Sequence, residues 1–172
     1  MSNILHSSET NEWYTPPEVM GLVRAFLGGP VDLDPASCEV ANRFVAAERY
    51  YTEEDDGLSL PWDGERVYNN PPYGGGTGKW VNKLLEEDPA VAVLLCNAVP
   101  DRKWFQRAWS AHSCRGVYFL DQRIKFIDEF GVQQSRPAHG NALIVFGDAQ
   151  IMAGVQYPGF SGMWARGNKW SK

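Results

Sequence analysis

The sequence predicts an open α/β sheet of the Rossmann type with helices on both faces. Short apolar runs of strand length alternate along the chain with segments of helical periodicity. The run Ala90–Cys96 is apolar throughout, as expected of a central strand that is covered on both faces. Two unusual segments, residues 34–37 and 70–73, each follow a predicted strand, which is where ligands bind in such sheets.

The first quarter of the chain indicates a helix, a strand and a second helix. Thr15–Glu18 has the capping-box pattern with proline at the first helical position, which predicts a helix that ends near Leu27 at Gly28. Val31–Asp34 is typical of a short strand. Ser37 is expected to cap the following helix.

The middle of the chain continues the alternation. Residues 49–64 are acidic and rich in turn formers, and Arg66–Tyr68 predicts a brief strand. A helix is expected from about Gly78 to Glu87, because its apolar residues recur at helical spacing. After the central strand, Asp101 is expected to cap a further helix.

The last third holds two more apolar runs, residues 116–120 and 142–146, which are predicted to be strands. A polar loop from about Asp121 to Asn141 separates them. From Asp148 onward the alternation is lost, and the aromatic and basic tail to Lys172 is either a packing segment or an interaction surface.

Composition and length restrict the class of protein. The 172 residues fit one domain, 1–172, and 44% hydrophobic with 22% charged residues excludes a disordered chain. No apolar run is long enough to cross a bilayer and no secretory signal begins the chain, so a cytoplasmic location is expected. The three cysteines are isolated, which argues against a zinc site. The oligomeric state is left open.

Charge is distributed unevenly between the two halves of the sequence. Residues 1–88 contain 6 Lys/Arg and 16 Asp/Glu, whereas residues 89–172 contain 10 and 5, and together they give the net charge of −5. An acidic half that holds a cationic ligand and a basic half that faces phosphates would explain this division. Chance placement of surface charges explains it equally well.

Two nucleotide-binding motifs can be excluded. Gly74–Lys79 resembles a phosphate-binding P-loop, but only three residues separate Gly74 from Gly78, and Trp80 stands where Ser or Thr must reach magnesium. No G-x-G-x-x-G pattern follows a strand. The sequence therefore argues against both ATP and a nicotinamide or flavin dinucleotide.

Asn70–Tyr73, with the sequence Asn-Pro-Pro-Tyr, is suited to hold a planar exocyclic amine. The Asn70 side-chain oxygen and the Pro71 carbonyl can each accept one N–H, and the two prolines keep the loop rigid without adding a donor. The Tyr73 ring can stack on a nucleobase. An activated methyl donor such as S-adenosylmethionine would suit the acidic first half, although a simple turn is the alternative interpretation of the tetrapeptide.

Most of the chain resembles the phage-type DNA adenine-N6 methyltransferases, which are amino-methyltransferases that use S-adenosylmethionine. The segments that carry the resemblance are Asn11–Glu18, Asp32–Ser37, Glu53–Leu58 with Trp62, Asn70–Tyr73, Lys103–Phe105 and Arg123–Phe126. The resemblance implies a class I methyltransferase sheet. It also implies base flipping, direct methyl transfer to adenine N6 in DNA, and a role for a phage in evading host restriction.

The resemblance assigns roles to individual residues. The catalytic loop would consist of Asn70, Pro71, Pro72 and Tyr73. The cofactor-binding residues would be Tyr14, Thr15, Pro16, Asp34, Pro35, Ala36, Ser37, Asp56, Gly57 and Leu58, with Asp34 attracting the methionine ammonium. The spacing from Asp34 to Asn70 predicts abbreviated second and third strands, and Glu48 is one candidate for a ribose-binding carboxylate.

Contacts to DNA are expected from loops, because no separate recognition domain fits in this length. The candidates are Arg102, Lys103, Arg123, Lys125 and Arg136, with residues 148–172 as a further contacting or packing tail. Cytosine N4 is an alternative target, since its amine has similar geometry. Methylation of RNA or protein, and a catalytically silent module that binds DNA or an adenosyl ligand, are the alternatives from other classes.

Overall fold

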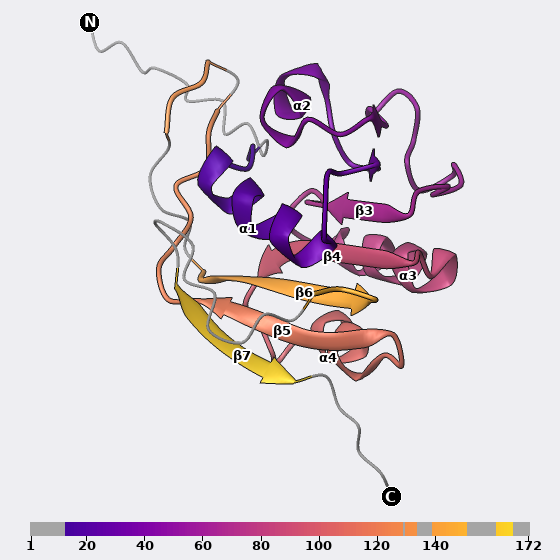
Figure 1. Ribbon diagram of the computed structural model, residues 1–172, viewed down its shortest axis with the longest axis vertical. Helices are drawn as coiled ribbons and strands as arrows, with labels where there is room; N and C mark the ends of the chain where they lie inside the picture. Colours follow the sequence, from indigo (N-terminus) through magenta and orange to yellow (C-terminus); the bar gives the residue numbers. More distant parts are fainter. Residues whose placement is uncertain (1–12, 129, 134–138, 151–160, 167–172) are drawn as a thin grey trace, which may run out of the picture.

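The computed structural model describes residues 13–128, 130–133, 139–150 and 161–166. Within them lies one seven-stranded sheet with four helices (Figure 1). The strands are β1 Leu33–Asp34, β2 Arg49–Tyr50, β3 Arg66–Asn69, β4 Val91–Asn97, β5 Cys114–Leu120, β6 Asn141–Gly147 and β7 Gly162–Arg166. The helices are α1 Pro17–Leu27, α2 Glu39–Val45, α3 Thr77–Glu87 and α4 Lys103–Ser110.

The strand order is β2-β1-β3-β4-β6-β5-β7. β2, β1, β3 and β4 run parallel to one another, and β6 is antiparallel to both β4 and β5. Strand β5 therefore runs in the same direction as β4, and the arrowheads of β3, β4 and β5 lie at the same edge of the sheet (Figure 1). The loops that follow these three strands consequently meet at one edge.

Helices cover both faces of the sheet, as predicted. Side chains of α1 and α2 pack with one set of strand residues, including Tyr68, Val93 and Leu143. Side chains of α3 and α4 pack with the opposite set, including Leu94 and Ile144. These features confirm the Rossmann-like sheet of a class I methyltransferase.

The predicted abbreviation of the second and third strands is also confirmed. β2 contains only two residues, and residues 51–65, all of which are described, form no strand before β3. β1 is equally short. The side of the sheet that contains β1 and β2 is therefore built mainly from loops, and side-chain contacts hold these loops in place.

Three predicted helix caps are wrong. Helix α1 has Pro16 at its N-cap and no side-chain cap, because the Thr15 hydroxyl bonds Tyr68 instead. Helix α2 is capped by Cys38, whose sulfur accepts the Ala41 N–H, and not by Ser37. Helix α4 has Arg102 at its N-cap, and Asp101 makes no cap bond. The expected end of α1 is correct, since Gly28 takes a left-handed conformation there.

The tail contains a strand that the sequence pattern did not predict. β7 pairs with β5 from Gly116–Arg166 to Leu120–Gly162, and the Trp109 indole donates to the Arg166 carbonyl. Trp164 packs against Phe26 and Tyr118 with ring centroids 5.0 Å apart in each pair. Residues 162–166 are thus a packing segment. No helix within the described ranges is long and apolar enough to cross a membrane.

Candidate active site

A cavity of about 530 Å³ lies at the carboxyl ends of β1 and β3. All the residues predicted for catalysis and cofactor binding line it except Pro16 and Leu58. The remaining lining residues are Trp13, Cys38, Ala41, Val45, Thr52, Glu53, Tyr68 and Trp80. The fold therefore brings the two unusual sequence segments into one cavity.

Asn70 is fixed in one orientation at this cavity. Its Nδ2 donates to the Trp13 carbonyl at 2.9 Å and to the Thr15 hydroxyl at 3.2 Å. Since the Trp13 carbonyl can only accept, the amide nitrogen must face it. The Asn70 Oδ1 is buried and has no donor among the described residues. A buried carbonyl oxygen without a donor is costly, so this atom is prepared to accept an N–H from a ligand.

Thr15 connects Asn70 to the core of the sheet. Its hydroxyl lies 2.6 Å from the Tyr68 hydroxyl. Tyr68 is fully buried on β3, and this burial raises the pKa of its phenol well above the ordinary value, so the hydroxyl stays protonated. Tyr68, Thr15 and Asn70 thus form a chain of hydrogen bonds that begins at β3 and ends at the loop Asn70–Tyr73.

Asp34 is the buried carboxyl group of the cavity, with 2% of its surface exposed. Burial raises its pKa to about 7, opposed by the nearby Ser37 hydroxyl and by the Ala36 N–H, which donates to Oδ1 at 3.3 Å. The Ser37 hydroxyl itself makes no hydrogen bond of ordinary geometry. No ion pair within the described part of the chain neutralises Asp34. The cavity therefore offers a buried site for a cation.

Gly57 lets two loops approach each other at the cavity wall. A Cβ at this position would lie 1.9 Å from the Pro35 carbonyl oxygen, so only glycine fits. The Trp62 indole donates to the Gly57 carbonyl at 2.8 Å and stacks on Trp80 at 6.2 Å. Asp56, whose φ is 54°, precedes this contact. Pro35, Gly57 and Trp80 form an apolar wall that suits a planar ring.

Tyr73 lines the same cavity and contacts the loop between β5 and β6. Its ring meets the edge of Phe126 at 5.8 Å, and Phe126 meets Trp13 at 5.9 Å. The Tyr73 hydroxyl is buried and has no hydrogen-bond partner within the described residues, and burial raises its pKa well above the ordinary value. Phe126 is buried, and its contact with Tyr73 links the loop Asn70–Tyr73 to the predicted DNA-contacting loop.

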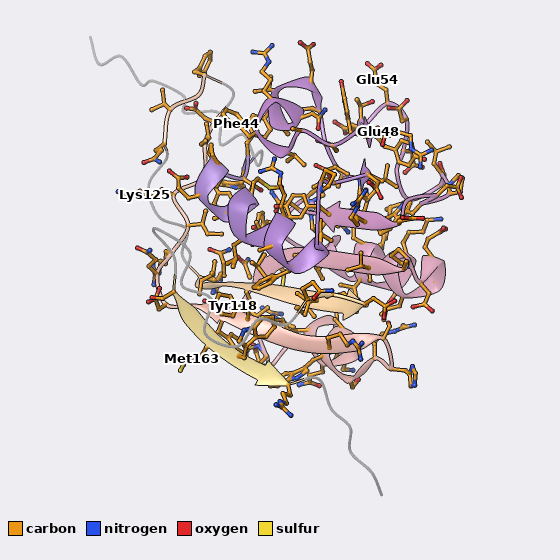
Figure 2. All side chains as sticks on the ribbon, in the orientation of Figure 1. Phe44, Glu48, Glu54, Tyr118, Lys125 and Met163 are labelled. Atoms are coloured by element: carbon orange, nitrogen blue, oxygen red, sulfur yellow. The ribbon has the colours of Figure 1, made fainter. Side chains whose placement is uncertain are left out.

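The carboxylate that the sequence analysis named as a candidate for ribose binding does not line the cavity. Glu48 is exposed and does not line the cavity, and its side chain is labelled in Figure 2. Glu53, which follows β2, does line the cavity. Glu53 belongs to the acidic run Glu53–Asp56. Which of these carboxylates reaches the cavity depends on where the short strand β2 ends, and the sequence alone does not show this.

The residues predicted to contact DNA that the structure describes do not line the cavity. Arg102 and Lys103 are exposed at the start of α4, after the carboxyl end of β4. Arg123 and Lys125 are exposed on the loop after β5, and Lys125 points outward there (Figure 2). Arg136 lies outside the described residues. These four residues therefore lie on loops at the sheet edge that holds Asn70.

Several cavity residues had no role in the sequence analysis. Trp13 lies within a segment that was recognised but without a function of its own, and Trp80 was considered only as a mismatch to the P-loop. Tyr68 has the pattern of an ordinary strand residue. Cys38 donates its thiol to the Tyr14 hydroxyl at 3.4 Å, which no sequence pattern indicates. No group of three metal-ligating side chains occurs among the residues described.

Comparisons with known proteins identify the family of the chain. Residues 2–153 match the family described as DNA N-6-adenine-methyltransferase (Dam). A DNA N-6-adenine-methyltransferase of Haemophilus phage HP1 is 24% identical over 143 residues, which cover 81% of this chain and 80% of the relative.

Among solved structures, the crystal structure of "a putative RNA methyltransferase PH1948 from Pyrococcus horikoshii" aligns with 63% of this chain and 55% of its own, at 16% identity and a TM-score of 0.43. The family match confirms the adenine-specific activity expected from the sequence. The chain belongs to the DNA N-6-adenine-methyltransferase (Dam) family, whose members methylate the N6 of adenine in DNA.

Proposed function

We propose that this cavity is the active site, in which an adenine taken out of DNA receives a methyl group directly on N6. The observation that carries the proposal is the buried Asn70 Oδ1, which lacks a donor while Nδ2 is held by Trp13 and Thr15. The exocyclic amine of adenine supplies the missing donor. A base inside a duplex cannot reach such a cavity, so the base must be flipped.

Asn70 and Pro71 prepare the amine for reaction. Asn70 Oδ1 accepts one N6–H and the Pro71 carbonyl accepts the other, which draws the nitrogen lone pair out of conjugation with the ring. The lone pair forms the new N–C bond as the bond between the methyl group and its leaving atom breaks. The surplus proton on N6 then leaves to water. Catalysis by this chain consists of positioning and of fixed dipoles.

The cavity fits S-adenosylmethionine as the methyl donor. S-adenosylmethionine supplies an electrophilic methyl group on a positively charged sulfur. Asp34 would hold its ammonium group, and the uncompensated burial of this carboxylate supports that role. Glu53 would accept from the ribose hydroxyls, and the wall of Pro35, Gly57 and Trp80 would hold the adenine ring.

Tyr14, Thr15, Ala36, Ser37 and Asp56 complete the proposed cofactor site, because all five line the cavity. Pro16 and Leu58 do not line it. Pro16 sets the N-cap of α1, and Leu58 follows the Asp56–Gly57 turn, so both would act through their neighbours.

The flipped base would lie between the amine acceptors and the aromatic residues of the cavity. Tyr73 is proposed to stack on the base, with Pro72 keeping the loop stiff. Arg102, Lys103, Arg123 and Lys125 would contact phosphates at the same edge of the sheet, and Arg136 is proposed for the same role. All described strands join one sheet, which supports a single catalytic domain over residues 1–172.

The proposal is tested by incubating the protein with labelled S-adenosylmethionine and unmethylated DNA and then identifying the labelled nucleoside. The expected labelled product is N6-methyladenine. Labelled N4-methylcytosine, or DNA in which no nucleoside carries the label, would contradict the proposal. Asn70→Ala should reduce the rate at least about 100-fold, as expected when a group that acts in the transition state is removed.

Asn70→Asp is the sharper variant. One of its carboxylate oxygens would face the Trp13 carbonyl in place of Nδ2, so two acceptors would meet and the side chain could not keep its position. We expect a loss similar to that of Asn70→Ala, with the dissociation constant of S-adenosylmethionine changed less than about threefold. Loss of cofactor binding in both variants would instead show that the loop is structural.

A further inference from the structure

Large hydrophobic side chains are exposed at few positions in the described residues, and two of them share one turn. Phe130 is 81% exposed and Val132 is 57% exposed, and the third such residue, Met163, lies on β7. A single exposed apolar residue is ordinary in a folded protein. An aromatic ring and a neighbouring valine displayed together on a built turn beside an active site require a reason.

The turn is held by its own hydrogen bonds. The Asp128 carboxylate accepts the backbone N–H groups of Phe130 at 2.9 Å and of Val132 at 2.8 Å. The Asp128 N–H donates to the Val132 carbonyl at 3.0 Å, and Gly131 takes a φ of 78° that favours glycine. The backbone of Phe130 is therefore ordered before any partner arrives.

This turn is attached directly to the wall of the active site. Ile127 exchanges two backbone hydrogen bonds with Tyr14, at 3.0 and 2.9 Å, and Tyr14 lines the cavity. Phe130 is three residues beyond Ile127, so their Cα atoms lie within about 11 Å of each other. The loop carrying the turn follows β5 and rises beside α1 and α2 at the active-site edge of the sheet (Figure 1).

The same loop carries positive charge. Arg123 and Lys125 are both exposed, while the intervening Ile124 is buried in the core and fixes the loop in place. Cations at the base of the loop and an apolar ring at its tip match a DNA duplex, in which phosphates surround an apolar stack of bases. This complementarity of charge, together with the DNA substrate of the family, favours DNA as the partner of this loop.

We propose that Phe130 is a wedge that enters the DNA base stack where the target adenine leaves it. Flipping a base removes its stacking contacts and opens a gap in the duplex, and apolar side chains inserted between base steps are known to stabilise distorted DNA. Phe130 fills the gap and keeps the adenine from returning. This inference rests on the proposed function, because it requires a flipped adenine.

The test compares wild-type protein and Phe130→Ala on two duplexes that contain a target sequence mapped beforehand with the wild type. In one duplex the target adenine is paired with thymine, and in the other it lies opposite an abasic site. We expect kcat/KM of Phe130→Ala to fall at least about tenfold on the paired duplex and less than about threefold on the other. The unpaired adenine leaves its stack at a lower cost and needs the wedge less.

Two further variants serve as controls. Val132→Ala removes the other exposed apolar side chain of the turn and should change kcat/KM less than about twofold on both duplexes. Phe130→Trp keeps a large flat ring and should restore activity on the paired duplex. Thermal unfolding should be unchanged in all three variants, since both positions are exposed.

Fluorescence of 2-aminopurine at the target position reports the flipped state directly. It should rise when the wild type binds and rise much less with Phe130→Ala. Equal activity of Phe130→Ala and wild type on the paired duplex would overturn the wedge, as would equal losses on both duplexes, or a change in the oligomeric state of the variant. A wild type that methylates no adenine would instead overturn the proposed function.

Discussion

The two sides of the sheet differ in how they are built. β4, β5 and β6 contain seven residues each, and all seven residues of β4 pair in register with β6. β1 and β2 contain two residues each. β4 and β6 are held by a continuous ladder, and six of the seven residues in each are buried, whereas the short strands leave their surroundings to loops.

The loops of the short side are fixed by side chains. Arg66 forms an ion pair with Asp32 at 2.7 Å, and Arg24 donates to the Val45 carbonyl at the end of α2 at 2.8 Å. Almost every residue of the cavity comes from this side. A longer strand would use its backbone N–H and C=O groups to pair with its neighbours. On the short side, these groups and the nearby side chains can face a ligand instead. Stability therefore depends mainly on the long strands, and function depends mainly on the loops of the short side.

The largest effect is expected from a change on the long side. Ile144 is fully buried and pairs with Leu94 and Val117. Ile144→Ala should lower the free energy of unfolding by about 2–5 kcal/mol, as in other buried large-to-small changes, and Ile144→Val by about 1 kcal/mol. Urea denaturation measures both. Below the unfolding transition the dissociation constant of S-adenosylmethionine should not change, and a parallel loss of affinity would contradict the division.

A change at Asp34, on the short side, should mainly affect the binding of the cofactor. With Asp34 ionised, the cationic end of S-adenosylmethionine gains a charge-assisted partner, and Asp34→Asn should weaken cofactor binding by about 30–100-fold. Because the pKa of Asp34 is raised to about 7, wild-type affinity should fall about tenfold from pH 8 to pH 6. Isothermal titration calorimetry measures both, and the pH dependence should disappear in Asp34→Asn.

Asp34 also affects the stability of the protein when no cofactor is bound. Its folded pKa lies above the ordinary 3.8, so the folded protein holds the proton more tightly than the unfolded chain. Its contribution to stability is therefore greatest below about pH 4 and is lost as pH rises to 7. Asp34→Asn should be more stable than wild type at pH 8, and the difference should vanish near pH 4. A less stable variant at pH 8 would show that Asp34 is structural.

The sequence was sufficient for the parts of the molecule that depend on local pattern. Ala90–Cys96 is apolar throughout because β4 is covered on both faces, and the structure confirms it as a central strand. The Asn-Pro-Pro-Tyr loop was recognisable because two prolines and an amide are rare after a strand. β7 was missed because Gly162–Arg166 has no alternation of apolar and polar residues.

Other features were unpredictable because they depend on contacts between distant segments. Thr15 has the pattern of a helix cap, but Tyr68, which is 53 residues away, bonds its hydroxyl. Gly57 is required by the approach of Pro35, which no spacing reveals. Where a tertiary contact competes with a local signal, the contact with the more buried partner prevails.

The smallest effect, and the one that tests how the side chain of Asn70 is positioned, is expected from Tyr68. Tyr68→Phe keeps the buried ring and removes only the hydroxyl that holds Thr15, and Thr15→Val removes the acceptor of Asn70 Nδ2. Either change leaves the Asn70 bond to the Trp13 carbonyl, so the amide should lose part of its alignment and kcat should fall about 3–10-fold, comparable to one ordinary hydrogen bond.

Thr15→Ser keeps the hydroxyl and should retain wild-type kcat, which separates positioning from the size of the side chain. KM for S-adenosylmethionine should stay within about twofold in Tyr68→Phe and Thr15→Ser, as measured by steady-state methylation of DNA. If kcat is unchanged in Tyr68→Phe, the Trp13 carbonyl alone orients Asn70. The short side of the sheet would then position its catalytic amide without help from the buried strand beneath it.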